Sequence, residues 1–244
     1  MSIREKSIIT GLYLSKYSHE GLNELGFKSF QEAFNVLGFS LSSKPASLKN
    51  YRDEFDPLFP NNRKGWHKRD IREYCKKYFD EYKDVDFLVF SNLIKSFFID
   101  NFEIEKFIEK IEKKDYSDSI AKRLITGKAA EEYFKSEYSK INIFSSYKIL
   151  DATQMACGFD YKLSLDSNYY CVEVKGLNGL TGSIQLTEKE FLVAQKMKSN
   201  YCLFIVKNFR EKPIHEYVFD PINSRLNFKE IKREIIQITY NTSI

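Results

Sequence analysis

The chain has 244 residues, of which 43% are hydrophobic and 30% are charged, so it is long enough and apolar enough to bury a core and to form two domains. Its four cysteines and three histidines are widely separated, which argues against a zinc site or a Ser-His-Asp triad, and no segment has the length and apolarity of a membrane span or signal peptide. With 38 basic and 34 acidic residues the net charge is +4, which permits a nucleic-acid partner, and we expect a cytoplasmic protein in which carboxylates and lysines carry any catalysis.

Residues 1–85 are predicted to form short helices separated by turns. Ser29 and Glu32 have the spacing of a capping box, which predicts a helix that begins there and ends at Gly38. A second helix is predicted over residues 47–55. Two short helices joined by a turn resemble a helix-turn-helix, although a small helical bundle with a solvated face accounts for the same pattern.

Two groups of residues in this region are candidates for DNA binding. The helix over 47–55 is predicted to direct Lys49, Asn50 and Arg52 outward. The segment 61–77 that follows has seven basic and two acidic residues, a local charge of +5 that suits phosphate contacts. Its candidate phosphate contacts are Arg63, Lys64, Lys68 and Arg69.

The second half of the chain changes from helices to strands. Residues 86–118 are predicted to form a helical connector, and residues 117–119 offer caps for a helix of about 20 residues that ends near Lys140. Strands are predicted over the ranges 147–153, 158–165, 169–175 and 201–207. A capping box at Thr187 and Glu190 predicts a helix between the last two strands. For residues 213–244 an added strand, a helix and an oligomer contact all remain open.

The second and third strands are predicted to form an antiparallel hairpin, and its register decides which side chains meet. A two-residue loop at 166–167 places Asp160 opposite Glu173, whereas a loop at 167–168 places Asp160 opposite Lys175. Because side chains alternate with period two, Glu173 and Lys175 share a face, so either loop gathers all three. A three-residue loop would require a bulge to restore this cluster.

These side chains suit metal-dependent hydrolysis of a phosphodiester. Asp160, Glu173 and the backbone carbonyl of Val174 would supply oxygen ligands to Mg²⁺. Lys175 would orient the attacking water or neutralise charge that develops on the phosphate.

The segments around these residues resemble the PD-(D/E)xK nuclease superfamily, and in particular the domain at the C-terminus of the plant protein NO VEIN, which also occurs in bacterial restriction proteins. The resemblance spans residues 119–210 and rests on short segments: 126–132, 158–160, 170–176, 184–190 and 201–208. It implies an αβββαβ fold of the restriction-endonuclease type and a catalytic set in which Glu131 reaches the metal or its water. It also implies a glutamine beside the site, here Gln185. The proline that the superfamily usually has before the aspartate is replaced by Phe159.

The sequence therefore predicts an α+β or α/β protein with a helical DNA-recognition domain (1–85), a helical connector (86–118) and a nuclease domain (119–244). We expect a Mg²⁺-dependent DNA endonuclease, with Mn²⁺ as a substitute metal, that acts as a homodimer in the cytoplasm of a bacterium or archaeon. A type II restriction enzyme with a companion DNA methyltransferase fits this organisation. The alternatives are a repair, junction-resolving or modified-base-dependent nuclease, and a non-catalytic DNA-binding protein with a nuclease-like fold.

Overall fold

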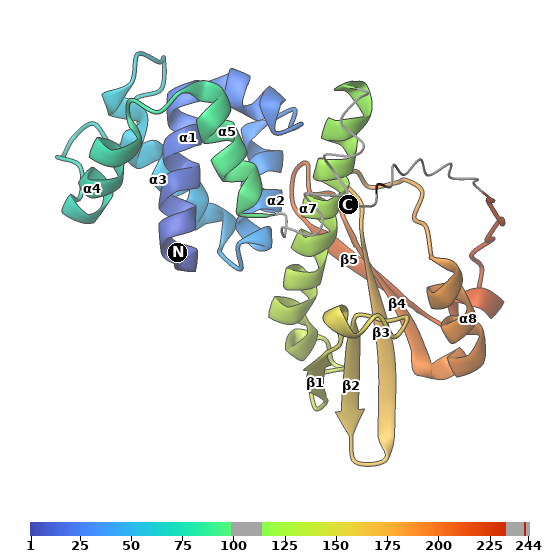
Figure 1. Cartoon of the computed structure of the whole chain (residues 1–244). Coiled ribbons are helices and arrows are strands. Elements are labelled where there is room, and N and C mark those ends of the chain that lie inside the picture. The colour runs from blue at the N-terminus through green and yellow to red at the C-terminus, as the bar shows by residue number, and fades with distance from the viewer. Residues whose placement is uncertain (99–113, 233–241, 243–244) are drawn as a thin grey trace.

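The computed structural model describes residues 1–98, 114–232 and 242. For residues 114–121 it describes the backbone alone. It is a mixed α and β structure in which a helical N-terminal region packs beside a five-stranded sheet (Figure 1). No helix within the described ranges combines the length and the apolarity needed to cross a bilayer. Residues 99–113 of the expected connector lie outside the described residues.

The helical module, residues 3–98, contains five α-helices and one short 3₁₀ helix. They are α1 (Ile3–Glu24), α2 (Phe30–Ser40), α3 (Pro45–Phe55), the 3₁₀ helix η1 (Asp56–Leu58), α4 (Glu73–Tyr82) and α5 (Phe87–Ser96). The expectation of short helices is wrong for α1, whose 22 residues include a kink at Ser18, where φ is 50°. Residues 7–15 of α1 are all buried, so the helix lacks the polar stripe by which a surface helix is recognised in a sequence.

The α2 helix begins where the sequence predicts and ends later. The Ser29 side chain accepts a hydrogen bond from the backbone of Glu32 at 3.2 Å. The predicted end at Gly38 is wrong, because α2 continues to Ser40. A Cβ atom at Gly38 would lie 2.9 Å from the Cα of Pro45, so this glycine allows α2 and the start of α3 to approach closely rather than ending the helix.

The second half contains a long helix, the sheet and a crossover helix. Helix α7 (Lys114–Glu137) begins earlier than the predicted caps at 117–119 and is followed by a 3₁₀ turn. The other elements are β1 (Lys148–Asp151), β2 (Tyr161–Leu165), β3 (Asn168–Gly176), α8 (Glu188–Met197), β4 (Tyr201–Lys207) and β5 (Ile214–Phe219). The strands lie in the order β1-β2-β3-β4-β5, with β3 and β4 parallel and all other neighbours antiparallel. The predicted αβββαβ order is confirmed, and β5 is the added strand.

The loop between β2 and β3 has the first of the two predicted registers. Leu165 pairs with Asn168, and Asp166 takes a left-handed conformation with a φ of 51°, which closes a two-residue loop. The ladder ends where Tyr161 pairs with Val172, so β3 extends beyond its neighbour and leaves a free edge.

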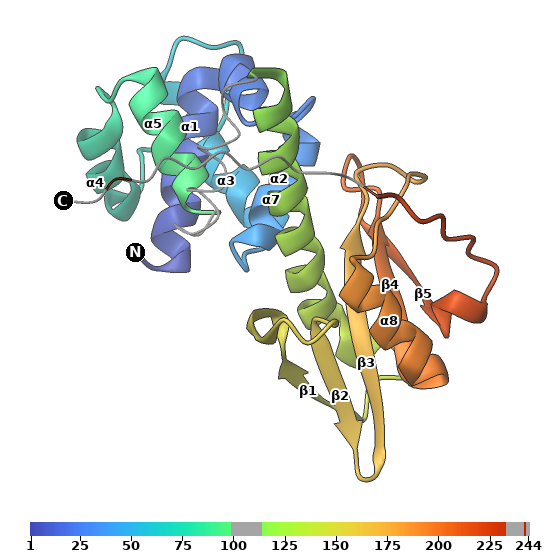
Figure 2. The same ribbon diagram turned by 45° about the vertical axis from the view of Figure 1, so that its right-hand side comes forward.

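The two faces of the sheet are covered by different helices, with α7 on one side and α8 on the other (Figures 1 and 2). Val172 and Val174 point to the α7 face and join the main core together with Phe134 of α7. Cys171 points to the other face, where it packs with Ala194 of α8. Glu173 and Lys175 alternate with these valines and therefore belong to the α8 face.

The helical module is fixed to the sheet region by buried polar contacts. The side-chain amide of Asn35 donates hydrogen bonds of 2.8 Å to the backbone carbonyls of Phe209 and Glu211, which follow β4. Ser40 donates to the Ile125 carbonyl of α7 at 2.8 Å. One continuous hydrophobic core also runs through both regions. Buried hydrogen bonds of this kind hold the two regions in one orientation.

Candidate active site

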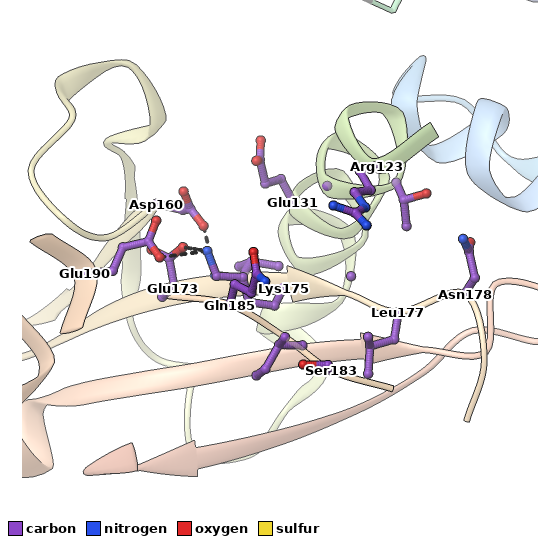
Figure 3. Close-up of a pocket in the computed structure, with 15 residues that line it drawn as sticks. Arg123, Glu131, Asp160, Glu173, Lys175, Leu177, Asn178, Ser183, Gln185 and Glu190 are labelled. Carbon is purple, nitrogen blue, oxygen red and sulfur yellow. Dashed lines mark hydrogen bonds and ion pairs between the residues drawn. The ribbon is translucent and has the colours of Figure 1, made fainter. Parts of the chain in front are cut away.

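A pocket of about 600 Å³ opens at the free edge of β3. It lies between α7, the extended end of β3, the loop after β3 and the first turn of α8 (Figure 3). Its lining is Arg123, Thr126, Gly127, Glu131, Asp160, Glu173, Val174, Lys175, Gly176, Leu177, Asn178, Ser183, Ile184, Gln185 and Glu190. Every predicted catalytic residue is in this lining.

Asp160 occupies the point where the β2–β3 ladder ends. Its backbone amide donates to the Val172 carbonyl at 3.0 Å, and its Oδ2 accepts a hydrogen bond of 2.8 Å from the Val174 amide. The aspartate side chain thus replaces the missing strand partner along the free edge of β3. The backbone turns into this position at Gly158, whose φ of 91° favours glycine. Strand pairing therefore determines where the carboxylate lies.

Glu173 and Lys175 lie side by side on β3, as the alternation of side chains predicts. The Lys175 Nζ is 2.6 Å from Glu173 Oε1 and 2.8 Å from Oε2 of Glu190 on α8. Glu173 is only 3% exposed. The lysine therefore links a buried carboxylate of the sheet to a carboxylate of the crossover helix (Figure 3).

Glu131 reaches the pocket from α7, on the opposite side from Glu190 (Figure 3). Its neighbour Glu132 points elsewhere, because it accepts a hydrogen bond of 2.7 Å from Ser42 of the helical module and pairs with Lys135 at 2.7 Å. Only one of the two adjacent glutamates faces the site, as a helix with 100° between successive residues requires.

The carboxylates of the pocket are held in an environment that disfavours their charge. Burial, assisted by the charge of Asp160, raises the pKa of Glu131 to about 8. Burial also raises the pKa of Asp160 in spite of the Val174 amide, and burial together with Asp160 raises that of Glu173. Burial opposes the charge of Lys175, but the adjacent glutamates outweigh it and the pKa of Lys175 is raised. The pocket therefore has an excess of negative charge that a bound cation would relieve.

The donors present are compatible with a hard divalent cation. Across residues 1–98 and 122–232, no three His, Cys, Asp or Glu side chains gather closely enough to hold a metal by themselves. Mg²⁺, however, is commonly bound through one or two carboxylates and keeps several water ligands. Asp160 and Glu173 each direct one oxygen to an N–H donor, the Val174 amide and Lys175 respectively. The second oxygen of each carboxylate and the Val174 carbonyl remain as candidate ligands.

Gln185 lines the pocket and is exposed, whereas Glu131 and Asp160 are half-buried and Glu173 is buried. The sequence analysis did not identify two other residues of the pocket lining, Glu190 and Arg123, as candidate functional residues. Glu190 was visible there only as part of a capping box. Arg123 precedes Glu131 by eight residues, with Gly127 midway between them. Residues four apart in a helix lie on the same side, so this spacing could have predicted that Arg123 and Glu131 face the same pocket.

Among the predicted DNA-binding residues, the three arginines pair with carboxylates of the fold, whereas the lysines and Asn50 extend from the surface. Lys49, Asn50, Lys64 and Lys68 are exposed. The expectation that Arg52 points outward is wrong. Its side chain is 11% exposed, pairs with Asp53 and Asp56, and lies over the rings of Phe30 and Phe34, because the buried Asp56 requires a cationic partner.

Arg63 and Arg69 also make internal contacts. Arg63 binds the buried Asp56 at 2.9 Å and donates to the Ser15 carbonyl of α1. Arg69 binds the buried Glu54 and stacks over Trp66 with 4.6 Å between the guanidinium and the ring. Both residues therefore fasten the segment between α3 and α4 to the helical module, and part of the basic charge seen in the sequence is neutralised within the fold.

The family model described as Protein NO VEIN, C-terminal matches residues 128–219, which is less than half of the chain. The matched family is nuclease-like. The match runs from α7 to the end of β5 and includes Glu131, Asp160, Glu173, Lys175 and Glu190, whereas Arg123 precedes it. No curated protein and no solved structure gives a significant match.

Proposed function

We propose that the chain is a Mg²⁺-dependent endonuclease of the PD-(D/E)xK type that cleaves double-stranded DNA. The observation that carries this proposal is the gathering of Asp160, Glu173 and Lys175 in one pocket at the end of the β2–β3 ladder, with Glu131 of α7 facing them. All four residues lie within the part of the chain that matches the nuclease-like family.

Each residue has a role that follows from its surroundings. Asp160, Glu173 and the Val174 carbonyl would hold the divalent cation, which supplies Lewis acidity and a more acidic bound water. Lys175 keeps its charge beside Glu173 and would direct its remaining N–H group toward the attacking water or a phosphate oxygen. Glu131 accepts hydrogen bonds from water at the α7 side of the pocket.

The DNA would be held by residues outside the cluster of carboxylates. Arg123 extends into the pocket from α7, on the same helix as Glu131 and away from Glu190, and suits a phosphate of the bound strand (Figure 3). The exposed Lys49, Asn50 and Lys68 of the helical module suit contacts to duplex DNA farther away. A type II restriction enzyme that acts as a homodimer, with a companion methyltransferase, remains the proposed biological setting.

Alanine variants at Asp160, Glu173 and Lys175 test the proposal. We expect each to abolish cleavage with Mg²⁺ or Mn²⁺ and to retain DNA binding measured by gel shift with Ca²⁺. Lys207→Ala is the matched control, since it removes a lysine that pairs with Glu216 at 2.8 Å on β4 and β5, outside the pocket lining. Near-normal cleavage by Lys175→Ala would contradict the assignment. DNA binding without cleavage by the unaltered chain would favour the non-catalytic alternative.

A further inference from the structure

The ammonium group of Lys175 is held from two different elements of the fold. An ammonium has three N–H donors. Lys175 directs one to Glu173 Oε1 at 2.6 Å on its own strand and another to Glu190 Oε2 at 2.8 Å on α8 (Figure 3). Two fixed partners leave one donor for the pocket. The direction of this third N–H is set by the positions of the two carboxylates.

Glu190 is itself held in place by the start of α8. Its Oε2 accepts a hydrogen bond of 2.9 Å from the backbone amide of Thr187, and its backbone amide donates to Thr187 Oγ1 at 3.2 Å. These are the two bonds of a capping box, in which the glutamate normally serves only its own helix. Here the same oxygen also accepts from Lys175, and the Glu190 side chain is 16% exposed.

The two carboxylates that hold Lys175 differ in what else they must do. Glu173 is a proposed ligand of the cation, and a carboxylate shared with a divalent cation attracts an ammonium less strongly. Glu190 has no such second partner, and its other contacts belong to the helix start. Glu190 is therefore the partner that can hold Lys175 throughout the reaction.

We propose that Glu190 is a positioning residue, which holds the ammonium of Lys175 toward the attacking water and the scissile phosphate. This inference rests on the proposed nuclease function. Glu190 is an anion in a pocket that receives a polyanion, so its own charge opposes DNA binding. Loss of Glu190 should therefore lower the rate of cleavage without lowering the affinity for DNA. A residue that only stabilised the helix would not produce that separation.

Four variants separate the contact with Lys175 from the helix cap. Glu190→Gln keeps the size and the acceptor for the Thr187 amide but removes the charge, and Glu190→Ala removes both. Thr187→Ala weakens the same helix start and leaves the carboxylate beside Lys175. Glu188→Gln removes an exposed charge from the same turn. Single-turnover cleavage with Mg²⁺, the Kd for DNA with Ca²⁺ and thermal unfolding are measured for each.

We expect both Glu190 variants to cleave DNA roughly 10- to 100-fold more slowly than the unaltered chain, because a misplaced catalytic group lowers the rate by about this factor. Both variants should bind DNA at least as tightly as the unaltered chain. Thr187→Ala and Glu188→Gln should cleave at the unaltered rate. Normal cleavage by Glu190→Gln, an equal loss in Thr187→Ala, or a loss of DNA affinity in the Glu190 variants would overturn the positioning role. An unaltered chain that cleaves no DNA would instead overturn the proposed function, and the positioning role with it.

Discussion

Replacing Glu131 with glutamine is expected to make the metal-free protein more stable at high pH while it slows cleavage. Glu131 is a partly buried carboxylate on α7 that faces Asp160 across the pocket. Burial and the negative charge of Asp160 raise its pKa to about 8. Because this value exceeds that of the unfolded chain, the folded protein binds the proton more tightly.

The sign and size of the effect follow from that difference. The contribution to stability is complete below the ordinary value of 4.5 and is lost as the pH rises through 8. At 1.36 kcal/mol for each pKa unit, ionised Glu131 lowers the free energy of unfolding by at most about 5 kcal/mol. Glutamine carries no charge at any pH. The stability of the Glu131→Gln variant relative to the unaltered chain should therefore increase as the pH rises from 5 to 9.

Urea unfolding followed by circular dichroism, at several pH values between 5 and 9 with EDTA present, measures this difference. Glu132→Gln is the control, because it makes the same chemical change one residue along α7 on a side chain bound to Ser42 and Lys135 outside the pocket. Parallel stability curves for Glu131→Gln and the unaltered chain would refute the reasoning. In cleavage assays we expect Glu131→Gln to lose less activity than Asp160→Ala, because the proposed role of Glu131 is to contact the metal through water.

Four further substitutions test the helical module. Glu54→Ala leaves two arginines without their buried partner and should lower the free energy of unfolding by about 3 kcal/mol, measured by urea unfolding. Gly11→Ala places a Cβ 2.5 Å from the Cβ of Tyr51, so α1 and α3 must separate. We expect the free energy of unfolding to fall by about 1–3 kcal/mol, measured by thermal unfolding. An unchanged melting temperature would contradict the close packing of these helices. Asn50→Ala should relax sequence preference at one base pair, whereas Lys68→Ala should weaken binding to every DNA sequence and flatten its salt dependence, as compared by titration against a panel of duplexes. Unchanged affinity and preference in both would make the module a scaffold.

The sequence by itself determined the local features of the site. The hairpin between β2 and β3, the alternation that puts Glu173 beside Lys175, and the helix starts at Ser29 and Thr187 follow from bonds between residues close in the chain. Such features depend on backbone geometry and a period of two or of 3.6 residues, and therefore survive in any tertiary context. The αβββαβ order followed from the same signals.

Tertiary structure decided what lies against those features. Arg52 turns inward because Asp56 is buried next to it, and α2 passes through Gly38 because α3 packs there. Glu190 reaches Lys175 only because the crossover between β3 and β4 brings the start of α8 over the end of β3. The sequence gives the charge and size of each side chain, but the packing of segments far apart in the chain determines which partner it contacts. A buried charged group is stable only where another element of the fold supplies the opposite charge.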